Sequence, residues 1–274
     1  MITDMEKITD KPRAIILRTA GTNCSYETTY ALEKAGADVD LIHVNQLMKE
    51  KRLLDSYHIF VLPGGFTYGD DIAAGKVLAN QLRQHLQNEL TRFVDKGKLI
   101  IGICNGFQVL IKMGLLPGMK GTKAPLNGYK QKFTLTCNDS NKFEDRWVYL
   151  KSFSNKSVFV DEDSILYVPI AHAEGKFVAE NEEELDALSN SGQIVFKYVD
   201  KDGNIADYPW NPNGSLGNIA GVCDSTGRIL GMMPHPERYI DPTQHPRWTR
   251  EGLKAEGDGI SVFRNAVNYI SGSM

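Results

Sequence analysis

A strand-to-helix motif with a cysteine at its tip constrains this chain more than any other feature. Residues 98–113 read KLIIGICNGFQVLIKM, and the apolar run Leu99–Ile103 passes into a helical pattern through GICNG at 102–106. This is the G-x-nucleophile-x-G form of a nucleophile elbow. The glycines are needed because a sharp turn leaves no room for Cβ atoms beside its tip. The pattern therefore predicts that Cys104 sits strained and exposed at the end of a strand.

The position of Cys104 would also activate it. Its sulfur would lie at the N-terminus of the following helix, where free N–H groups and the helix dipole favour thiolate over thiol. The alternative is a buried cysteine that ends a core strand, a common state of free cysteines. A short motif needs structural context before it indicates a nucleophile.

The first half of the chain alternates between short apolar strands and helical patterns. We expect strands at Ala14–Leu17, Asp38–Val44, Ile59–Leu62 and Leu99–Ile103, and helices at Tyr26–Ala35, Leu47–Leu54 and Val77–Val94. This alternation is typical of a doubly wound α/β fold, whose mostly parallel central sheet is covered by helices on both faces. Ligands bind such sheets at the carboxyl ends of the strands. The loops Arg18–Ser25 and Pro63–Asp71 would meet the Cys104 elbow there.

In the second half, strand-like segments follow one another. They are Lys132–Thr136, Arg146–Leu150, Ser157–Val160, Ile165–Val168, Gln193–Val199, Ile219–Cys223 and Ile229–Met233, with helices at Glu180–Ser189 and Ile260–Ile270. This order predicts additional antiparallel strands. Tyr239–Gly257 is polar and irregular, which indicates a surface excursion or a contact with another chain. Without a linker or repeat, we expect residues 1–274 to form a single domain.

Composition excludes several classes of function. The 31 Lys and Arg residues nearly balance the 34 Asp and Glu residues, for a net charge of −3, so neither nucleic acid nor an anionic membrane is an expected partner. The polar N-terminus resembles no signal peptide and no apolar run could span a membrane, so a cytoplasmic protein is expected. The four cysteines lack the spacing of a disulfide framework or a metal site, and Cys24 is expected to be structural.

A cysteine nucleophile needs a base, and His235 is the best candidate. It stands in MPHPE at 233–237, directly after the strand Ile229–Met233. Its flanking prolines favour an extended chain, in which residues two apart project from the same side, so Glu237 would orient the imidazole. The alternative is a solvated proline-rich turn.

A glycine-rich loop and two further side chains complete the candidate site. Backbone N–H groups of Gly65 and Phe66, in PGGFTYGD at 63–70, would form an oxyanion hole with the N–H of Asn105. The alternative is a plain strand-to-helix turn. Gln108 lies one helical turn past Cys104 and would bind a polar substrate, unless it is simply a surface glutamine.

His172 is a second candidate, either beside the substrate or as a rival base. It stands in PIAHAEG at 169–175, where an extended chain would place Glu174 on the same side. A packed histidine is the more common state. Residues 69–76 superficially resemble a phosphate loop, but their glycine spacing and Val77 do not fit one, so nucleotide binding is not expected there.

Several blocks together resemble a known family. They are GTNC at 21–24, GGFTYGD at 64–70, GICNGFQ at 102–108, GLLPG at 114–118, RWV at 146–148, PIAH at 169–172, NPNGS at 211–215 and GMMPHPER at 231–238. They are similar to the triad (class I) glutamine amidotransferases, and among these to the glutaminase subunits of phosphoribosylformylglycinamidine synthase in purine biosynthesis. Thr67 and Ala173 depart from that pattern, at positions where serine and glycine are expected.

The resemblance implies a reaction and its partners. Cys104 would attack the side-chain amide of L-glutamine, His235 would protonate the departing ammonia, and Gln108 would help hold the substrate. The ammonia would pass to a separate synthetase subunit that uses ATP and magnesium, often with a small third subunit, and this chain itself would bind no cofactor. Two alternatives stay open: another cysteine hydrolase of the superfamily, such as a peptidase or deglycase, and a non-catalytic binding subunit.

Overall fold

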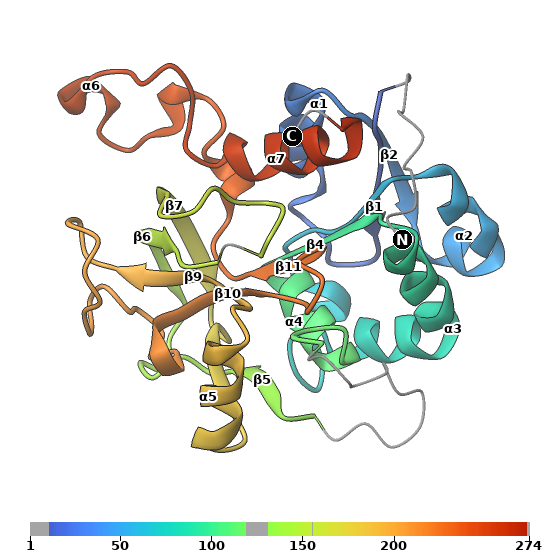
Figure 1. Cartoon of the computed structure of the whole chain (residues 1–274), viewed down its shortest axis with the longest axis horizontal. Helices are drawn as coiled ribbons and strands as arrows, with labels where there is room; N and C mark the ends of the chain where they lie inside the picture. Colours follow the sequence, from blue (N-terminus) through green and yellow to red (C-terminus); the bar gives the residue numbers. More distant parts are fainter. Residues whose placement is uncertain (1–10, 119–130, 155, 273–274) are drawn as a thin grey trace.

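A nine-stranded mixed sheet forms the centre of the computed structural model, which describes residues 11–118, 131–154 and 156–272 (Figure 1). Its strands are, in spatial order, β2 (Asp38–His43), β1 (Arg13–Arg18), β3 (Ile59–Leu62), β4 (Leu99–Ile103), β11 (Ile229–Met232), β10 (Ile219–Cys223), β9 (Ile194–Val199), β6 (Glu144–Ser152) and β7 (Ile165–His172). A separate two-stranded sheet pairs β5 (Phe133–Thr136) with β8 (Lys176–Ala179).

The sheet divides into a parallel and an antiparallel half. Strands β2, β1, β3, β4 and β11 pair in parallel. Their order, read as 2-1-3-4-5, is that of flavodoxin-like doubly wound folds. From β11 onward, β10, β9, β6 and β7 all pair antiparallel. The predicted fold class, mostly parallel with antiparallel strands added by the second half, is therefore confirmed.

Helices lie on both sides of the parallel half. The helices of the described residues are α1 (Ser25–Ala35), α2 (Val44–Lys49), α3 (Lys76–Asp95), α4 (Asn105–Met113), α5 (Glu182–Asn190), α6 (Trp248–Glu251) and α7 (Ile260–Ser271), of which α5 and α6 lie away from the parallel half (Figure 1). The first and last of the longer helices, α1 and α7, contact each other, and so do α3 and α4 (Figure 1). None of the helices in the described residues combines the length and apolar character of a membrane span.

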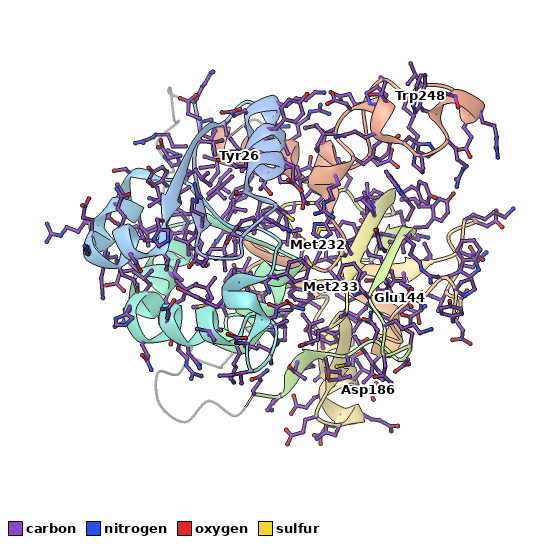
Figure 2. The ribbon with its side chains drawn as sticks, turned by 180° about the vertical axis from the view of Figure 1, so that it is seen from behind. Tyr26, Glu144, Asp186, Met232, Met233 and Trp248 are labelled. Atoms are coloured by element: carbon purple, nitrogen blue, oxygen red, sulfur yellow. The ribbon has the colours of Figure 1, made fainter. Side chains whose placement is uncertain are left out.

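The core sits between these layers. All residues of β3, β4 and β11 are buried, which fits strands covered on both faces. Figure 2 shows Met232 and Met233 in the interior, where both are almost completely buried, and Tyr26 and Trp248 at the periphery. The short helix α6 lies within Tyr239–Gly257, which extends away from the central sheet as predicted (Figure 1).

Two predicted elements are wrong, because side chains capture nearby backbone N–H groups. The helix expected at Leu47–Leu54 begins earlier, as α2, since the His43 side chain accepts the N–H of Asn45 at 3.2 Å. A 3-10 helix follows it at Lys51–Ser56. No strand forms at Ser157–Val160, because Ser154 Oγ accepts the N–H of Ser157 at 3.2 Å and holds a turn there.

The strand predicted to end at Val168 is longer than expected. Strand β7 continues to His172 and pairs with β6, with Pro169 opposite Trp147. Proline is tolerated because β7 is the edge strand and the missing N–H interrupts no central ladder. His172 therefore ends a strand instead of lying in a loop. The pattern also missed β8, a strand of only four residues.

Candidate active site

The elbow at Cys104 joins β4 to α4 with strained backbone. Cys104 has φ 50° and ψ −106°, values that are rare for a residue with a side chain. A Cβ on Gly106 would lie 1.9 Å from Leu62 O, and one on Gly102 would lie 2.7 Å from Gly106 O. Both glycines are thus required by close backbone approach, as predicted. The tip is not exposed: Cys104 is 5% exposed, with its Sγ 3.8 Å from Ala171 O.

The sheet register brings His235 to the same edge as Cys104. Met232 at the end of β11 pairs with Ile103 at the end of β4, and the Cys104 N–H donates to Met232 O at 2.8 Å. Because the two strands are parallel, the residues that follow them emerge together. The N–H of His235 donates to Pro169 O at 2.8 Å, which fixes the turn against β7.

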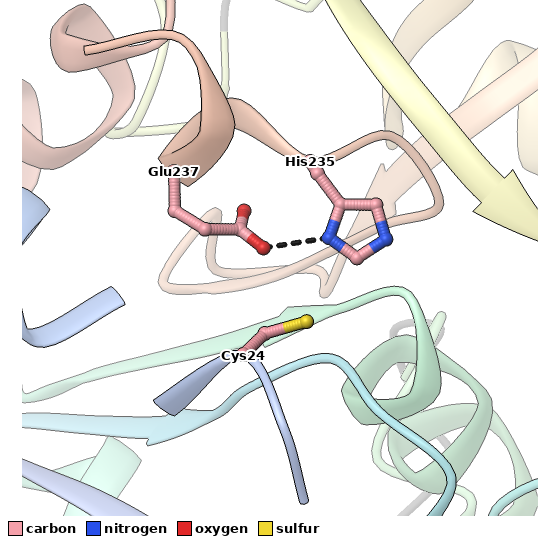
Figure 3. Close-up of side chains that lie close together, drawn as sticks. All are labelled: Cys24, His235 and Glu237. Atoms are coloured by element: carbon pink, nitrogen blue, oxygen red, sulfur yellow. Dashed lines mark hydrogen bonds and ion pairs between the residues drawn. The ribbon is translucent and has the colours of Figure 1, made fainter. Parts of the chain in front are cut away.

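The predicted contact between His235 and Glu237 is present, although not in an extended chain. Residues Pro236–Arg238 form a 3-10 turn, within which His235 Nδ1 donates to Glu237 Oε1 at 2.6 Å (Figure 3). Both side chains are 1% exposed. Burial by itself lowers the pKa of His235, but the charges of Glu237 and Cys104 outweigh it and raise that pKa well above its ordinary value. The ring therefore favours the imidazolium form.

The other ring nitrogen of His235 is available for proton transfer. His235 Nε2 is buried and finds no hydrogen-bond partner among the described residues. Glu237 holds Nδ1 as a donor, which is the orienting role of the acidic member in a catalytic triad. Cys104 follows β4, the strand that pairs with β11, so the sulfur and this ring belong to neighbouring strand ends. The arrangement suits base-assisted nucleophilic chemistry.

A small cavity of about 50 Å³ opens beside Cys104. Its walls are Gly65, Phe66, Asp70, Ala74, Cys104, Gln108, Ala171, His172, Ala173 and Glu174. The structure thus gathers most of the predicted site residues around one space. His235 and Glu237 lie outside this lining set, and Asn105 follows Cys104 directly in the chain.

Two of the three predicted oxyanion donors are available. In the described part of the chain, the N–H groups of Gly65 and Asn105 donate to no acceptor. The prediction for Phe66 is contradicted, because its N–H donates to Gly21 O at 2.9 Å and is therefore occupied. That bond is part of a close approach between the two loops, in which a Cβ on Gly65 would lie 2.8 Å from Asn23 N. Phe66 contributes only to the cavity wall.

Gln108 is buried and not a surface residue. It is 3% exposed, its Nε2 donates to Glu174 O at 2.6 Å, and its Oε1 accepts from Asn105 Nδ2 at 3.0 Å. Asn105 also donates to Asp70 Oδ1 at 3.0 Å, and its Oδ1 accepts from the hydroxyl of Thr67 at 2.7 Å. This polar network ties the elbow to the glycine-rich loop.

Three charged residues lie near the cavity, and of these only Glu174 had a predicted role, as the partner of His172. Asp70 and Glu174 line it, and Lys112 Nζ lies 3.9 Å from Glu174 Oε2. Burial raises the pKa of Asp70 and lowers that of Lys112. One signal for Lys112 was in the sequence: it follows Cys104 and Gln108 at intervals of four, which places all three on one helix face.

His172 does not form the rival pair with Glu174. Its Nδ1 lies 3.2 Å from Asn138 Oδ1, whereas Glu174 Oε2 accepts the N–H of Ala74 at 3.3 Å. The strand geometry of β7 places His172 in the cavity wall, 3% exposed. Burial, assisted by the positive charge of His235, lowers the pKa of His172 to about 3. His172 is therefore neutral at physiological pH.

We expect the neutral state of His172 to make stability fall in acid. Its pKa is near the model-peptide value of 6.5 in the unfolded chain and about 3 in the fold, so the unfolded chain binds the extra proton between these values. The contribution is complete above pH 6.5 and is lost as the pH falls toward 3. Urea unfolding should show a loss of about 2–3 kcal/mol between about pH 6.5 and 4.5. Over the same pH range, the free energy of unfolding of His172→Gln should decrease less than that of the wild type, by that amount. An equal decrease in both proteins would contradict a buried neutral His172.

Cys24 lies beside His235, which its sequence context did not predict. Its side chain is 1% exposed and points toward the His235–Glu237 pair (Figure 3). Arg238 Nη2 donates to Cys24 Sγ at 3.2 Å. Burial raises the pKa of the Cys24 thiol, against the opposing effects of His235 and Arg238. Only the tertiary structure reveals this proximity, because Cys24 and His235 belong to opposite ends of the chain.

Comparison with known proteins connects this site to one family. Residues 11–270 match the family described as CobB/CobQ-like glutamine amidotransferase domain. The chain is 48% identical over 262 residues to the phosphoribosylformylglycinamidine synthase subunit PurQ of Dehalococcoides mccartyi, covering 94% of this chain and 98% of the relative. The corresponding subunit of Archaeoglobus fulgidus is 42% identical over 269 residues, covering 94% and 97%.

Solved structures agree. The structure of PurLQS from Thermotoga maritima contains a chain that is 32% identical, with a TM-score of 0.70, covering 95% of this chain and 99% of that one. A glutamine amidotransferase from Thermotoga maritima shares the fold at 15% identity, with a TM-score of 0.54 and coverage of 96% and 99%.

Proposed function

Because the chain belongs to the glutamine amidotransferase family, among the subunits of phosphoribosylformylglycinamidine synthase, we propose that Cys104, His235 and Glu237 are its catalytic triad. The chain is the glutaminase subunit of that ligase in purine biosynthesis, and its partner is the synthetase subunit. The observation that carries the triad is the buried 2.6 Å contact between His235 Nδ1 and Glu237 Oε1, which leaves Nε2 without another partner among the described residues.

The geometry supports the following sequence of steps. The Cys104 thiolate attacks the side-chain amide carbon of glutamine, and the N–H groups of Gly65 and Asn105 stabilise the oxyanion. His235, which favours its protonated form, gives a proton to the leaving ammonia. Water then attacks the thioester with His235 as base and releases glutamate. Glu237 keeps the imidazole in the required orientation throughout.

Substrate binding is assigned to the cavity wall. Gln108 and the neutral His172 offer hydrogen-bonding groups to glutamine. We assign the α-ammonium group of the substrate to Asp70 and Glu174, because both carboxyl groups line the cavity and Lys112 pairs with Glu174 only. On substrate binding, Gln108 Nε2 would give up its hydrogen bond to Glu174 O and donate to glutamine instead.

The remaining assignments extend the same proposal. This chain binds no cofactor, whereas the synthetase binds ATP and magnesium. A small third subunit completes the assembly. Residues 1–274 act as one domain, a reading supported by the nine-stranded sheet, which joins strands from both halves of the chain. A cytoplasmic location suits a thiol nucleophile, because the cytosol keeps cysteines reduced.

The direct test is release of glutamate from glutamine, measured for the chain alone and together with its synthetase. We expect glutamate in the complex, with one ammonia transferred for each glutamate released. A cysteine peptidase would instead cleave peptides and leave glutamine intact, and a binding subunit would do neither. Absence of glutamate in the assembled complex would refute the proposed function.

A further inference from the structure

Three potential metal ligands meet at the proposed triad, two of them members of the triad itself. They are the sulfur of Cys24, a ring nitrogen of His235 and a carboxylate oxygen of Glu237, which all lie within 4.8 Å of one another (Figure 3). Each of the three side chains is 1% exposed. Thiolate, imidazole and carboxylate together are a ligand set that zinc takes in proteins.

Gly64 permits this close arrangement. A Cβ at position 64 would lie 2.7 Å from His235 Cε1, 3.0 Å from Cys24 Sγ and 3.3 Å from His235 Nδ1. The sulfur and the Nδ1 edge of the ring therefore face the same point. Any larger residue would separate them, so the glycine brings Cys24 to the side of the imidazole that Glu237 holds.

The Glu237 carboxylate has one oxygen with unused hydrogen-bonding capacity, on the side that faces away from Cys24 (Figure 3). Glu237 Oε2 is buried and has no hydrogen-bond partner among the described residues. A buried carboxylate oxygen without a partner is unfavourable, and a bound cation would satisfy it.

We propose that Cys24, His235 Nδ1 and Glu237 form a binding site for a soft divalent metal ion, with Zn²⁺ as the representative, which inhibits the enzyme reversibly. The inference rests on the proposed function, because it concerns regulation of the same triad. Three protein ligands leave the fourth position of a tetrahedral zinc ion for water.

Metal binding requires small movements. Nδ1 and Oε1 lie 2.6 Å apart, whereas two such ligands of one tetrahedral zinc ion lie about 3.3 Å apart. The Glu237 carboxylate must therefore move back by about 0.7 Å. The positive charge of Arg238, 3.2 Å from Cys24 Sγ, opposes a cation and must turn away. Its Nε already pairs with Glu27 at 3.1 Å on the partly exposed side, and this ion pair can hold the guanidinium once Nη2 leaves the sulfur.

The proton balance explains the inhibition. Zinc displaces one proton from the Cys24 thiol and one from Nδ1 of the His235 imidazolium, while Nε2 keeps its proton. The ring then has no Nδ1–H for Glu237 and no free nitrogen to accept a proton. Metal binding and catalysis therefore exclude each other, and the apparent affinity for zinc should rise with pH.

The test titrates the full chain with Zn²⁺ by calorimetry and with Co²⁺ by absorption, where a sulfur-to-cobalt charge-transfer band reports a thiolate ligand. We expect one ion per chain. Cys24→Ser should weaken binding about 100-fold or more and remove the band, since loss of even an outer-shell partner costs about 10- to 100-fold. Cys137→Ser, which changes an exposed thiol, is the matched control and should bind as the wild type does.

Other outcomes separate this inference from the proposed function. Cys104→Ser should lose glutamine hydrolysis yet keep the band and the zinc affinity, because the site does not need that sulfur. Glu237→Gln should weaken zinc binding, which guards against a folding defect in Cys24→Ser. Wild-type affinity and an unchanged band in both Cys24→Ser and Glu237→Gln would overturn the metal site and leave the glutaminase assignment intact.

Discussion

Replacing Cys104 by alanine is expected to abolish glutamine-dependent synthesis in the assembled complex while leaving ammonia-dependent synthesis intact. The substitution removes the only sulfur at the elbow between β4 and α4, whose strained backbone aims it into the cavity. Loss of the nucleophile of a triad lowers kcat by about 10⁴-fold or more, because the residual binding groups cannot form the covalent intermediate. Glutamate release and product formation with glutamine or ammonium chloride are the measurements.

The matched control for this variant is Cys137→Ala, which removes an exposed thiol. It should keep both glutamine- and ammonia-dependent rates. Covalent labelling by a glutamine-like electrophile adds an independent observation, since modification should occur at Cys104. Full glutaminase activity in Cys104→Ala, or labelling at Cys24 or Cys223, would show that another sulfur is the nucleophile.

The second large effect is expected for Glu237→Gln. Glutamine keeps the size of the side chain but removes the charge that raises the pKa of His235 and the acceptor that fixes its ring. Loss of the orienting acid of a triad costs about 10⁴-fold in kcat in the serine-protease example, and we expect about 10³- to 10⁴-fold here. Glutamate release by purified complex is the measurement.

The pH profile distinguishes this role from simple structural damage. His235 needs its proton as general acid, and Glu237 keeps that proton bound to higher pH. In Glu237→Gln the alkaline limb of the kcat/KM profile should therefore move to lower pH. Glu27→Gln, which breaks a partly exposed ion pair with Arg238, should leave the limb in place. An unmoved limb in Glu237→Gln would contradict the orienting role.

The parallel half of the fold was predictable because its signals are local. The apolar runs at Ile59–Leu62 and Leu99–Ile103 appear as β3 and β4 with those bounds. The helix after them ends at Gly114, which adopts the left-handed conformation that glycine favours. Each of these features depends on residues within one or two turns of chain.

Apart from the two elements that a nearby side chain altered, the errors arose where a distant partner decided the conformation. Pro169 lies within β7 because that strand is the sheet edge, a fact that only the strand order supplies. Four-residue β8 exists because β5 pairs with it. In the site, the N–H of Phe66 donates to Gly21 O. This contact joins two loops that are far apart in the chain, so the spacing of residues within either loop does not predict it.

The sequence by itself determined the elbow at Cys104, the alternation that makes a parallel sheet, and the pairing of His235 with Glu237, since each depends on neighbours in the chain. Only the tertiary structure decided that a second sulfur, that of Cys24, lies beside that histidine. Cys24 reaches His235 because β1, β3, β4 and β11 end at one edge of the sheet and Gly64 leaves the space between them. The physical reason is that strand register and close packing bring together residues far apart in the chain, whereas spacing describes only those that are near.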